Sequence, residues 1–272
     1  MIDYADWVGR CETAEDVIAP QPVARLIATL GRDDPPPAAG HALPPLWHWL
    51  YFLEATPRGL LAADGHARRG GFLPPSDLPR RMWAGGRLTF HKPLRIGEAA
   101  RRESEIISIT PKRGRSGELL FVTLRHVISG EAGAAITEEQ DIVYREAPSG
   151  AAPPGEQPPG DALWRRDFTA DPALLLRFSA LTFNAHRIHY DRDYAVHTEG
   201  YGGLVVHGPL IALLLLDLLR DEAPGRDLAG FDYQALAPLF DTAPFTLAGT
   251  HQTLWAERPD GALAMRGTPT FA

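Results

Sequence analysis

The chain has 272 residues, 44% of them hydrophobic, so it is long enough for one large domain or two modest ones with a sizeable core. A formal net charge of −7 at pH 7 argues against nucleic acid or an anionic membrane as a partner. The single cysteine, Cys11, excludes an internal disulfide and a cysteine-based zinc site. No apolar run reaches the ~20 residues of a membrane helix and the acidic start lacks a signal-like core, so we expect a cytoplasmic protein.

The first part of the chain predicts helices followed by strands. Residues 13–16 resemble a helix cap with an acidic first turn, and residues 22–30 have helical spacing. Residues 46–53 are apolar or aromatic on nearly every face, which predicts a buried helix. A loop rich in glycine and arginine follows at 58–85. Alternating and β-branched stretches then predict four antiparallel strands at 87–96, 100–110, 118–129 and 135–145.

A segment rich in proline and glycine divides the chain. Residues 147–160 have no periodicity and predict an extended linker between a first half, residues 1–146, and a second half, residues 161–272. The second half repeats the order of the first, with a helix capped by Asp171, a polar loop and an apolar helix from Pro209. Its strands are expected at 164–169, 231–239, 245–256 and 262–271.

The apolar helix that starts at Pro209 determines the expected fold. It should be about 12 residues or ~18 Å long, and burying each of its leucines is worth ~1.5–3 kcal/mol. A strongly curved antiparallel sheet wrapped around the helix would cover its apolar surface. Two halves with this layout predict an α+β protein with a double hot-dog fold, in which each curved antiparallel sheet wraps around a central apolar helix.

The polar loop before that helix is the strongest functional signal. Four of the ten histidines, His186, His189, His197 and His207, fall within 22 positions. Such histidines can be ordinary surface or capping residues. Their density, together with Asn184 and nearby charged residues, instead favours an active-site loop.

Residues 181–191, LTFNAHRIHYD, resemble the hydratase-2 motif of the MaoC-like, R-specific enoyl-thioester hydratases. The resemblance is closest to the branch that contains mesaconyl-C4-CoA or itaconyl-CoA hydratases and mitochondrial-type 3-hydroxyacyl-thioester dehydratases. Residues 82–87, MWAGGR, resemble the N-terminal dehydratase-like domain of that branch. The resemblance implies a double hot-dog hydro-lyase that needs no metal and no cofactor except coenzyme A as part of its substrate.

The motif also implies catalytic roles. His189 occupies the position of the family's histidine and is expected to act as the general base. Asn184 stands where the family usually has aspartate; an amide can orient a water molecule but cannot usefully exchange a proton near neutral pH. The backbone N–H of Gly208, at the start of the apolar helix, is the candidate donor to the enolate oxygen.

Arg187 is the candidate residue for recognising the acyl group of the substrate. Its guanidinium could bind the carboxylate of mesaconyl-C4-CoA, or it could form an outward ion pair with Asp191 or Asp193, and the sequence leaves both open. The further residues expected to bind substrate are His186, Tyr190, His207, Arg80, Arg81 and Arg87. Candidate cations for the phosphates of coenzyme A lie at 68–69, 80–81 and 112–115.

The predicted function is the reversible hydration of a short dicarboxylic enoyl-CoA, such as mesaconyl-C4-CoA or itaconyl-CoA, to give citramalyl-CoA. A 3-hydroxyacyl-thioester dehydratase of fatty acid synthesis and a non-catalytic thioester-binding hot-dog protein remain alternatives. His186, His189, His207 and Asp191 do not form a convincing closed ligand set, so no metal is expected. The acid–base site is expected in the second half, and the surface that binds coenzyme A and the acyl group in the first half, because no polar cluster like 184–191 occurs before the linker. Both a monomer and a homodimer are open.

Overall fold

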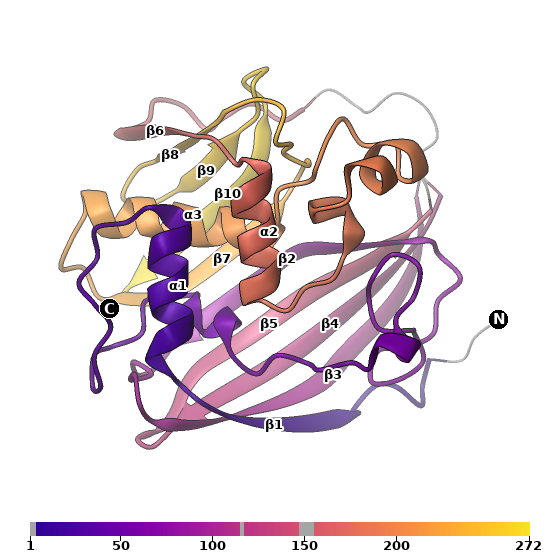
Figure 1. The fold of residues 1–272 in the computed structure, drawn as a ribbon, viewed down its shortest axis with the longest axis horizontal. Helices are drawn as coiled ribbons and strands as arrows, with labels where there is room; N and C mark the ends of the chain where they lie inside the picture. The colour runs from indigo at the N-terminus through magenta and orange to yellow at the C-terminus, as the bar shows by residue number, and fades with distance from the viewer. Residues whose placement is uncertain (1–3, 115–116, 147–154) are drawn as a thin grey trace.

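The computed structural model describes residues 4–114, 117–146 and 155–272. Within them, ten strands form one antiparallel sheet in the order β1-β3-β4-β5-β2-β7-β10-β9-β8-β6 (Figure 1). The first half supplies β1 (Cys11–Val17), β2 (Arg80–Phe90), β3 (Ala99–Gly114), β4 (Gly117–Gly130) and β5 (Gly133–Arg145). The second half supplies β6 (Trp164–Phe168), β7 (Leu228–Ala235), β8 (Phe245–Gly249), β9 (Leu254–Glu257) and β10 (Leu263–Phe271).

The two halves are joined by the pairing of β2 with β7, which runs from Gly85 opposite Gln234 to Thr89 opposite Gly230. This large antiparallel sheet with few helices confirms the expected α+β class. The domain bounds remain a prediction, and residues 147–154 of the expected linker lie outside the described residues. No helix in the described part of the chain is both long and apolar enough to cross a membrane.

The helix α3 (Gly208–Glu222) is the hydrophobic centre of the second half. Every residue from Leu210 to Leu219 is buried, and the helix packs against β8, β9 and β10. Pro209 occupies the first turn, where a missing N–H costs no intrahelical hydrogen bond. The predicted central apolar helix is therefore confirmed, and it places the histidine-rich loop at its N-terminus.

The first half lacks a comparable long helix among its described residues. Residues 46–53, predicted as a buried helix, form only the short 3-10 helix η1 (Trp47–Leu50), and most of them are buried as expected, whereas Leu53 is exposed. Positive φ angles at Leu46 (68°) and Phe52 (57°) interrupt the backbone on both sides. The helix prediction for this segment is wrong in form, and the concave face of the first half is left open.

Two further helices lie side by side against the sheet: α1 (Pro20–Leu30) and α2 (Pro172–Leu181) (Figure 1). The predicted cap of α2 is confirmed, because the Asp171 side chain accepts a hydrogen bond from the backbone N–H of Leu174 at 2.8 Å. A second 3-10 helix, η2 (Arg58–Leu60), lies in the glycine-rich loop.

Two further local predictions are wrong. Residues 13–16, predicted as a helix cap, belong to β1, because pairing with β3 overrides the local signal. The predicted strand at 245–256 is two strands, separated by a turn in which the Thr250 hydroxyl accepts hydrogen bonds from the backbone N–H groups of Gln252 and Thr253.

Candidate active site

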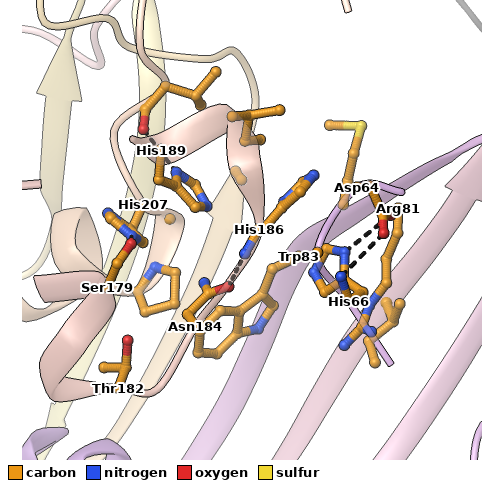
Figure 2. Close-up of a pocket in the computed structure, with 18 of the residues that line it drawn as sticks. Asp64, His66, Arg81, Trp83, Ser179, Thr182, Asn184, His186, His189 and His207 are labelled. Atoms are coloured by element: carbon orange, nitrogen blue, oxygen red, sulfur yellow. Dashed lines mark hydrogen bonds and ion pairs between the residues drawn. The ribbon is translucent and has the colours of Figure 1, made fainter. Parts of the chain in front are cut away.

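The histidine-rich loop borders a cavity of about 2450 Å³ that both halves line. Asn184, His186 and His189 reach it from the second half (Figure 2), and Gly208 of the same half also lines it. Asp64, His66, Arg81 and Trp83 reach it from the first half. The cavity therefore brings residues from distant parts of the chain to one place.

His189 ends the 3-10 helix η3 (Arg187–His189) and is buried. Its Nδ1 lies 2.7 Å from the backbone carbonyl oxygen of Val205, which can only accept a hydrogen bond. The hydrogen therefore sits on Nδ1, and Nε2 keeps its lone pair. Burial lowers the pKa of His189 to about 4, opposed by the Val205 hydrogen bond. The ring is thus a neutral base at physiological pH.

His207 supports the ring of His189 from one side. The two imidazoles stack with centroids 3.7 Å apart, and His207 Nε2 lies 2.8 Å from the hydroxyl oxygen of Ser179 on α2. Burial lowers the pKa of His207 well below its usual value. Its Nδ1 has no hydrogen-bond partner in the described part of the chain. The contacts of His207 fix the position of His189, and its predicted substrate-binding role remains a prediction.

Asn184 lies just after α2, where Phe183 takes a positive φ of 49°. Its Oδ1 accepts a hydrogen bond from the backbone N–H of His186 at 3.0 Å, so its Nδ2 donors are not needed for this turn. His186 is buried, and its pKa is lowered by burial and then by the neighbouring His66 and His189. Both side chains line the cavity.

Gly208 begins α3 and also lines the cavity. Within the described residues its backbone N–H has no hydrogen-bond acceptor. A Cβ added at Gly208 would lie 3.9 Å from the carbonyl oxygen of Trp83 in the other half. A flat ligand between the halves can therefore come close to this N–H, and the helix dipole favours negative charge there.

The first half contributes a polar pair that the sequence reasoning missed. Asp64 and His66 lie in the loop before β2, with Asp64 Oδ2 3.1 Å from His66 Nδ1. Hydrogen bonds from His66 outweigh the effect of burial and hold the pKa of Asp64 well below its usual range. Burial lowers the pKa of His66, against the opposing effect of Asp64. The first half therefore brings ionisable side chains to the cavity as well as the pocket surface expected of it.

Gly65 allows the loop that carries Asp64 and His66 to pack closely against the motif at residues 181–191. It has a φ of +93°, and a Cβ there would overlap the carbonyl oxygen of Ala185. The backbone N–H of Arg187 also donates to the carbonyl oxygen of Asp64 at 2.9 Å. The ring of His66 consequently lies 4.1 Å from that of His186, measured between centroids. The Asp-Gly-His sequence could have marked these residues as polar candidates, but it carries no sign of this contact with the motif.

Arg187 does not line the cavity. Its guanidinium binds the carboxylate of Asp191 at 2.8 and 3.0 Å and lies 4.2 Å from the centroid of the Tyr194 ring. The outward ion pair, one of the two roles left open, is the one that the structure contains. Arg187 is therefore unavailable to a carboxylate beside His189 unless this pair opens.

The other predicted arginines differ in their partners. Arg80 pairs with Glu199 at 3.1 Å, while Arg87 binds Glu139 and Asp141 on an exposed part of the sheet and does not line the cavity. Arg81 lines the cavity and has no ion pair or hydrogen bond with any described residue. Arg81 is thus a free cation at the site.

Tyr190 and the basic clusters lie further from the base. The Tyr190 hydroxyl donates to the carbonyl oxygen of Ala185 at 2.9 Å, and the side chain is exposed at the cavity lining. Arg69 donates to the backbone carbonyl oxygens of Ser76, Leu78 and Pro79 and thereby shapes its own loop. Arg115, one of the expected phosphate ligands, lies outside the described residues.

One group of side chains has the spacing of metal ligands. Asp64, His66 and His186 each offer one ligand atom, and these atoms lie within 4.8 Å of one another. The charge of Arg81 acts on both histidines. A guanidinium beside the group disfavours a divalent cation and favours an anion.

A second polar group lines the same cavity on the concave face of the first half. The buried Glu138 carboxylate accepts hydrogen bonds from His48 Nε2 at 3.1 Å and from Trp49 Nε1 at 3.1 Å. Burial by itself raises the pKa of Glu138, but these bonds and the neighbouring His126 lower it overall. His126 lies 2.8 Å from the Ser104 hydroxyl. This wall is less apolar than a site for a long hydrocarbon chain requires.

Known proteins share the sequence and the fold of this chain. Residues 46–241 match the family model described as hydroxyacyl-thioester dehydratase type 2. A mesaconyl-C(4)-CoA hydratase from Chloroflexus aurantiacus is 53% identical over 275 residues, covering 98% of this chain and 97% of its own.

Two solved structures show the same fold. A MaoC-like dehydratase from Phytophthora capsici has a TM-score of 0.72 at 13% identity, covering 100% of this chain and 98% of its own. A Mycobacterium tuberculosis protein described as a double hotdog has a TM-score of 0.57 at 16% identity, covering 97% and 96%. The expected double hot-dog architecture is confirmed.

Proposed function

Because this chain belongs to the hydroxyacyl-thioester dehydratase type 2 family, we propose that it is a hydro-lyase that adds water to mesaconyl-C4-CoA to give citramalyl-CoA. The observation that carries this proposal is the buried His189, whose Nδ1 is held by Val205 and whose Nε2 is free to accept a proton. The 53% identity to a mesaconyl-C(4)-CoA hydratase supports the choice of substrate.

The reaction needs a base, a hydrogen-bond donor to the enolate oxygen and a proton source, and two groups at the cavity supply these three functions. A water molecule donates one proton to His189 Nε2 while its oxygen bonds to the β-carbon of the enoyl group. The electrons of the double bond move into the thioester carbonyl, whose oxygen is stabilised by the backbone N–H of Gly208. The imidazolium of His189 then returns the proton to the α-carbon. The same histidine acts as base and acid, so water adds to one face.

Asn184 positions the attacking water in this scheme. Its Oδ1 is committed to the backbone of His186, so its Nδ2 group can donate a hydrogen bond to the oxygen of the water. The water then has one hydrogen directed at His189. An amide in this position orients the nucleophile without exchanging protons.

The nearest alternative is a 3-hydroxyacyl-thioester dehydratase of fatty acid synthesis, which the description of the family model supports. The size of the cavity, about 2450 Å³, also leaves room for a longer acyl chain. The polar wall around Glu138 and His126 favours a short, polar acyl group instead.

A direct assay separates these functions. The purified protein is incubated with mesaconyl-C4-CoA and with crotonyl-CoA, the loss of enoyl-thioester absorbance is followed, and mass spectrometry identifies the product. We expect hydration of both substrates with a higher kcat/KM for mesaconyl-C4-CoA. A preference for crotonyl-CoA would favour the dehydratase alternative, and no turnover of either would favour a binding protein.

A further inference from the structure

The cavity contains a guanidinium and a phenol that the chain leaves unpaired. Arg81 on β2 stands directly opposite Tyr144 on β5, so the two side chains extend from the same face of the sheet. Both line the cavity. Tyr144 is fully buried, yet its hydroxyl has no hydrogen-bond partner in the described part of the chain. The Arg81 guanidinium is half-buried and has no hydrogen bond or ion pair with a described residue either. A buried hydroxyl without a partner is costly unless a ligand binds it.

His66 lies beside this group. Its ring is held through Nδ1 by Asp64, and Arg81, His66 and Asp64 lie together at one end of the site in Figure 2. Because Nδ1 donates its hydrogen to Asp64, Nε2 of the neutral ring can only accept a hydrogen bond, so the donors for an anion are Arg81 and Tyr144.

The charges around this group favour an anion. Arg81 and Arg69 both act electrostatically on Tyr144, and Arg69 lies 4.9 Å from the centroid of its ring. Asp64 acts on both His66 and Tyr144, and its carboxylate is already bound by the histidine. A carboxylate can bind a guanidinium with two parallel hydrogen bonds and accept a third from a phenol.

This group lies on the His186 side of the base. His186 lies between His189 and His66 in Figure 2, with ring centroids 5.4 Å from the first and 4.1 Å from the second. In mesaconyl-C4-CoA the carbon attacked by water bears a carboxylate directly. When that carbon lies at His189, a carboxylate on the side of His186 is directed toward the end of the site that holds His66 and Arg81.

We propose that Arg81 and Tyr144 form a carboxylate seat that binds the free carboxylate of the acyl group. The inference rests on the proposed function and deepens it. The seat belongs to the first half and the base to the second, so each half contributes to recognition of the reacting carbon. Arg187, with its guanidinium bound to Asp191, is not part of the seat.

The test compares two saturated ligands of equal chain length, succinyl-CoA and butyryl-CoA, by calorimetry. Neither can be hydrated, so binding is measured whether or not the protein is a hydratase. We expect the parent protein to bind succinyl-CoA at least tenfold more tightly than butyryl-CoA. In Arg81→Gln this preference should disappear, through a loss of about 10- to 100-fold for succinyl-CoA and a change under threefold for butyryl-CoA.

Further variants sharpen the result. Tyr144→Phe should lose about three- to tenfold for succinyl-CoA only. Arg125→Gln is the matched control, because Arg125 pairs with Glu105 on an exposed position and does not line the cavity. It should bind both ligands as the parent does. Circular dichroism checks that each variant is folded.

Three results would overturn the seat. Equal losses for both ligands in Arg81→Gln would mean that Arg81 binds the phosphates of coenzyme A. Equal affinities of the parent for both ligands would mean that no carboxylate is recognised. Loss of the preference on treatment with a chelator would assign the site to a metal held by Asp64, His66 and His186. Failure of mesaconyl-C4-CoA hydration alone, with the preference intact, would refute the proposed reaction and leave the seat standing.

Discussion

The protonation state of His189 gives a prediction that the pH dependence of turnover can test. Catalysis needs the neutral imidazole, so activity should be lost as pH falls through the pKa of this ring. Burial lowers that pKa to about 4, whereas an ordinary histidine titrates near 6.5. The acidic limb of kcat/KM, which reports the free enzyme, should therefore lie well below pH 6.

The expected difference is large enough to measure at pH 5.5. With a pKa of about 4, about 97% of His189 is neutral at this pH, against about 9% for an unperturbed histidine, by the usual titration equation. Activity at pH 5.5 should thus stay close to its value at pH 7.5 instead of falling about tenfold.

The assay uses crotonyl-CoA, whose acyl group has no ionisable carboxylate, and follows kcat/KM from pH 4.5 to 8. Circular dichroism at each pH identifies the range in which the protein is folded. A midpoint between 6 and 7 in folded protein would refute the argument, because it would show that His189 is protonated as readily as a solvated histidine.

Three further predictions follow from the site. His189→Gln should lower kcat by about 100- to 10,000-fold while leaving thioester binding intact; activity within a few-fold of the parent would remove His189 from the mechanism. Asn184→Ala should lower kcat substantially, and Asn184→Asp should retain partial activity on crotonyl-CoA; a fully active alanine variant would exclude the water-positioning role. Burial lowers the folded-state pKa values of His186, His189 and His207. Below pH 6.5 the unfolded chain therefore binds more protons than the folded protein does. The free energy of unfolding, measured with urea, should therefore fall by up to about 4 kcal/mol between pH 7.5 and 5.5, and an unchanged value would show that these rings ionise in the folded protein.

The second half was predictable because its signals are local. Asp171 before a proline marks the start of α2, and an unbroken run of leucine from Leu213 to Leu216 requires a buried helix. The motif that carries Asn184 and His189 lies between these two helices. A reader of the sequence can therefore place the base at the N-terminus of α3 without a structure.

The first half was less predictable because its site residues depend on contacts distant in sequence. Nothing near Asp64 and His66 indicates that Gly65 packs on the backbone of Ala185. The same limit applies to residues 46–53, whose composition is that of a buried helix but whose backbone is turned at Leu46 and Phe52. Local patterns indicate burial, and tertiary packing decides the conformation.

The presence of Asn184 in place of the aspartate of the general motif is consistent with an anionic acyl group. A carboxylate at this position would raise the pKa of His189, because a nearby negative charge favours the imidazolium. It would also repel a carboxylate on the carbon that water attacks. The amide keeps a donor for the water and removes this charge, while Arg81 remains without a partner in the described residues. Residue 184 carries no fixed negative charge, and residue 81 carries an unpaired positive charge. Both features favour a substrate that has its own carboxylate.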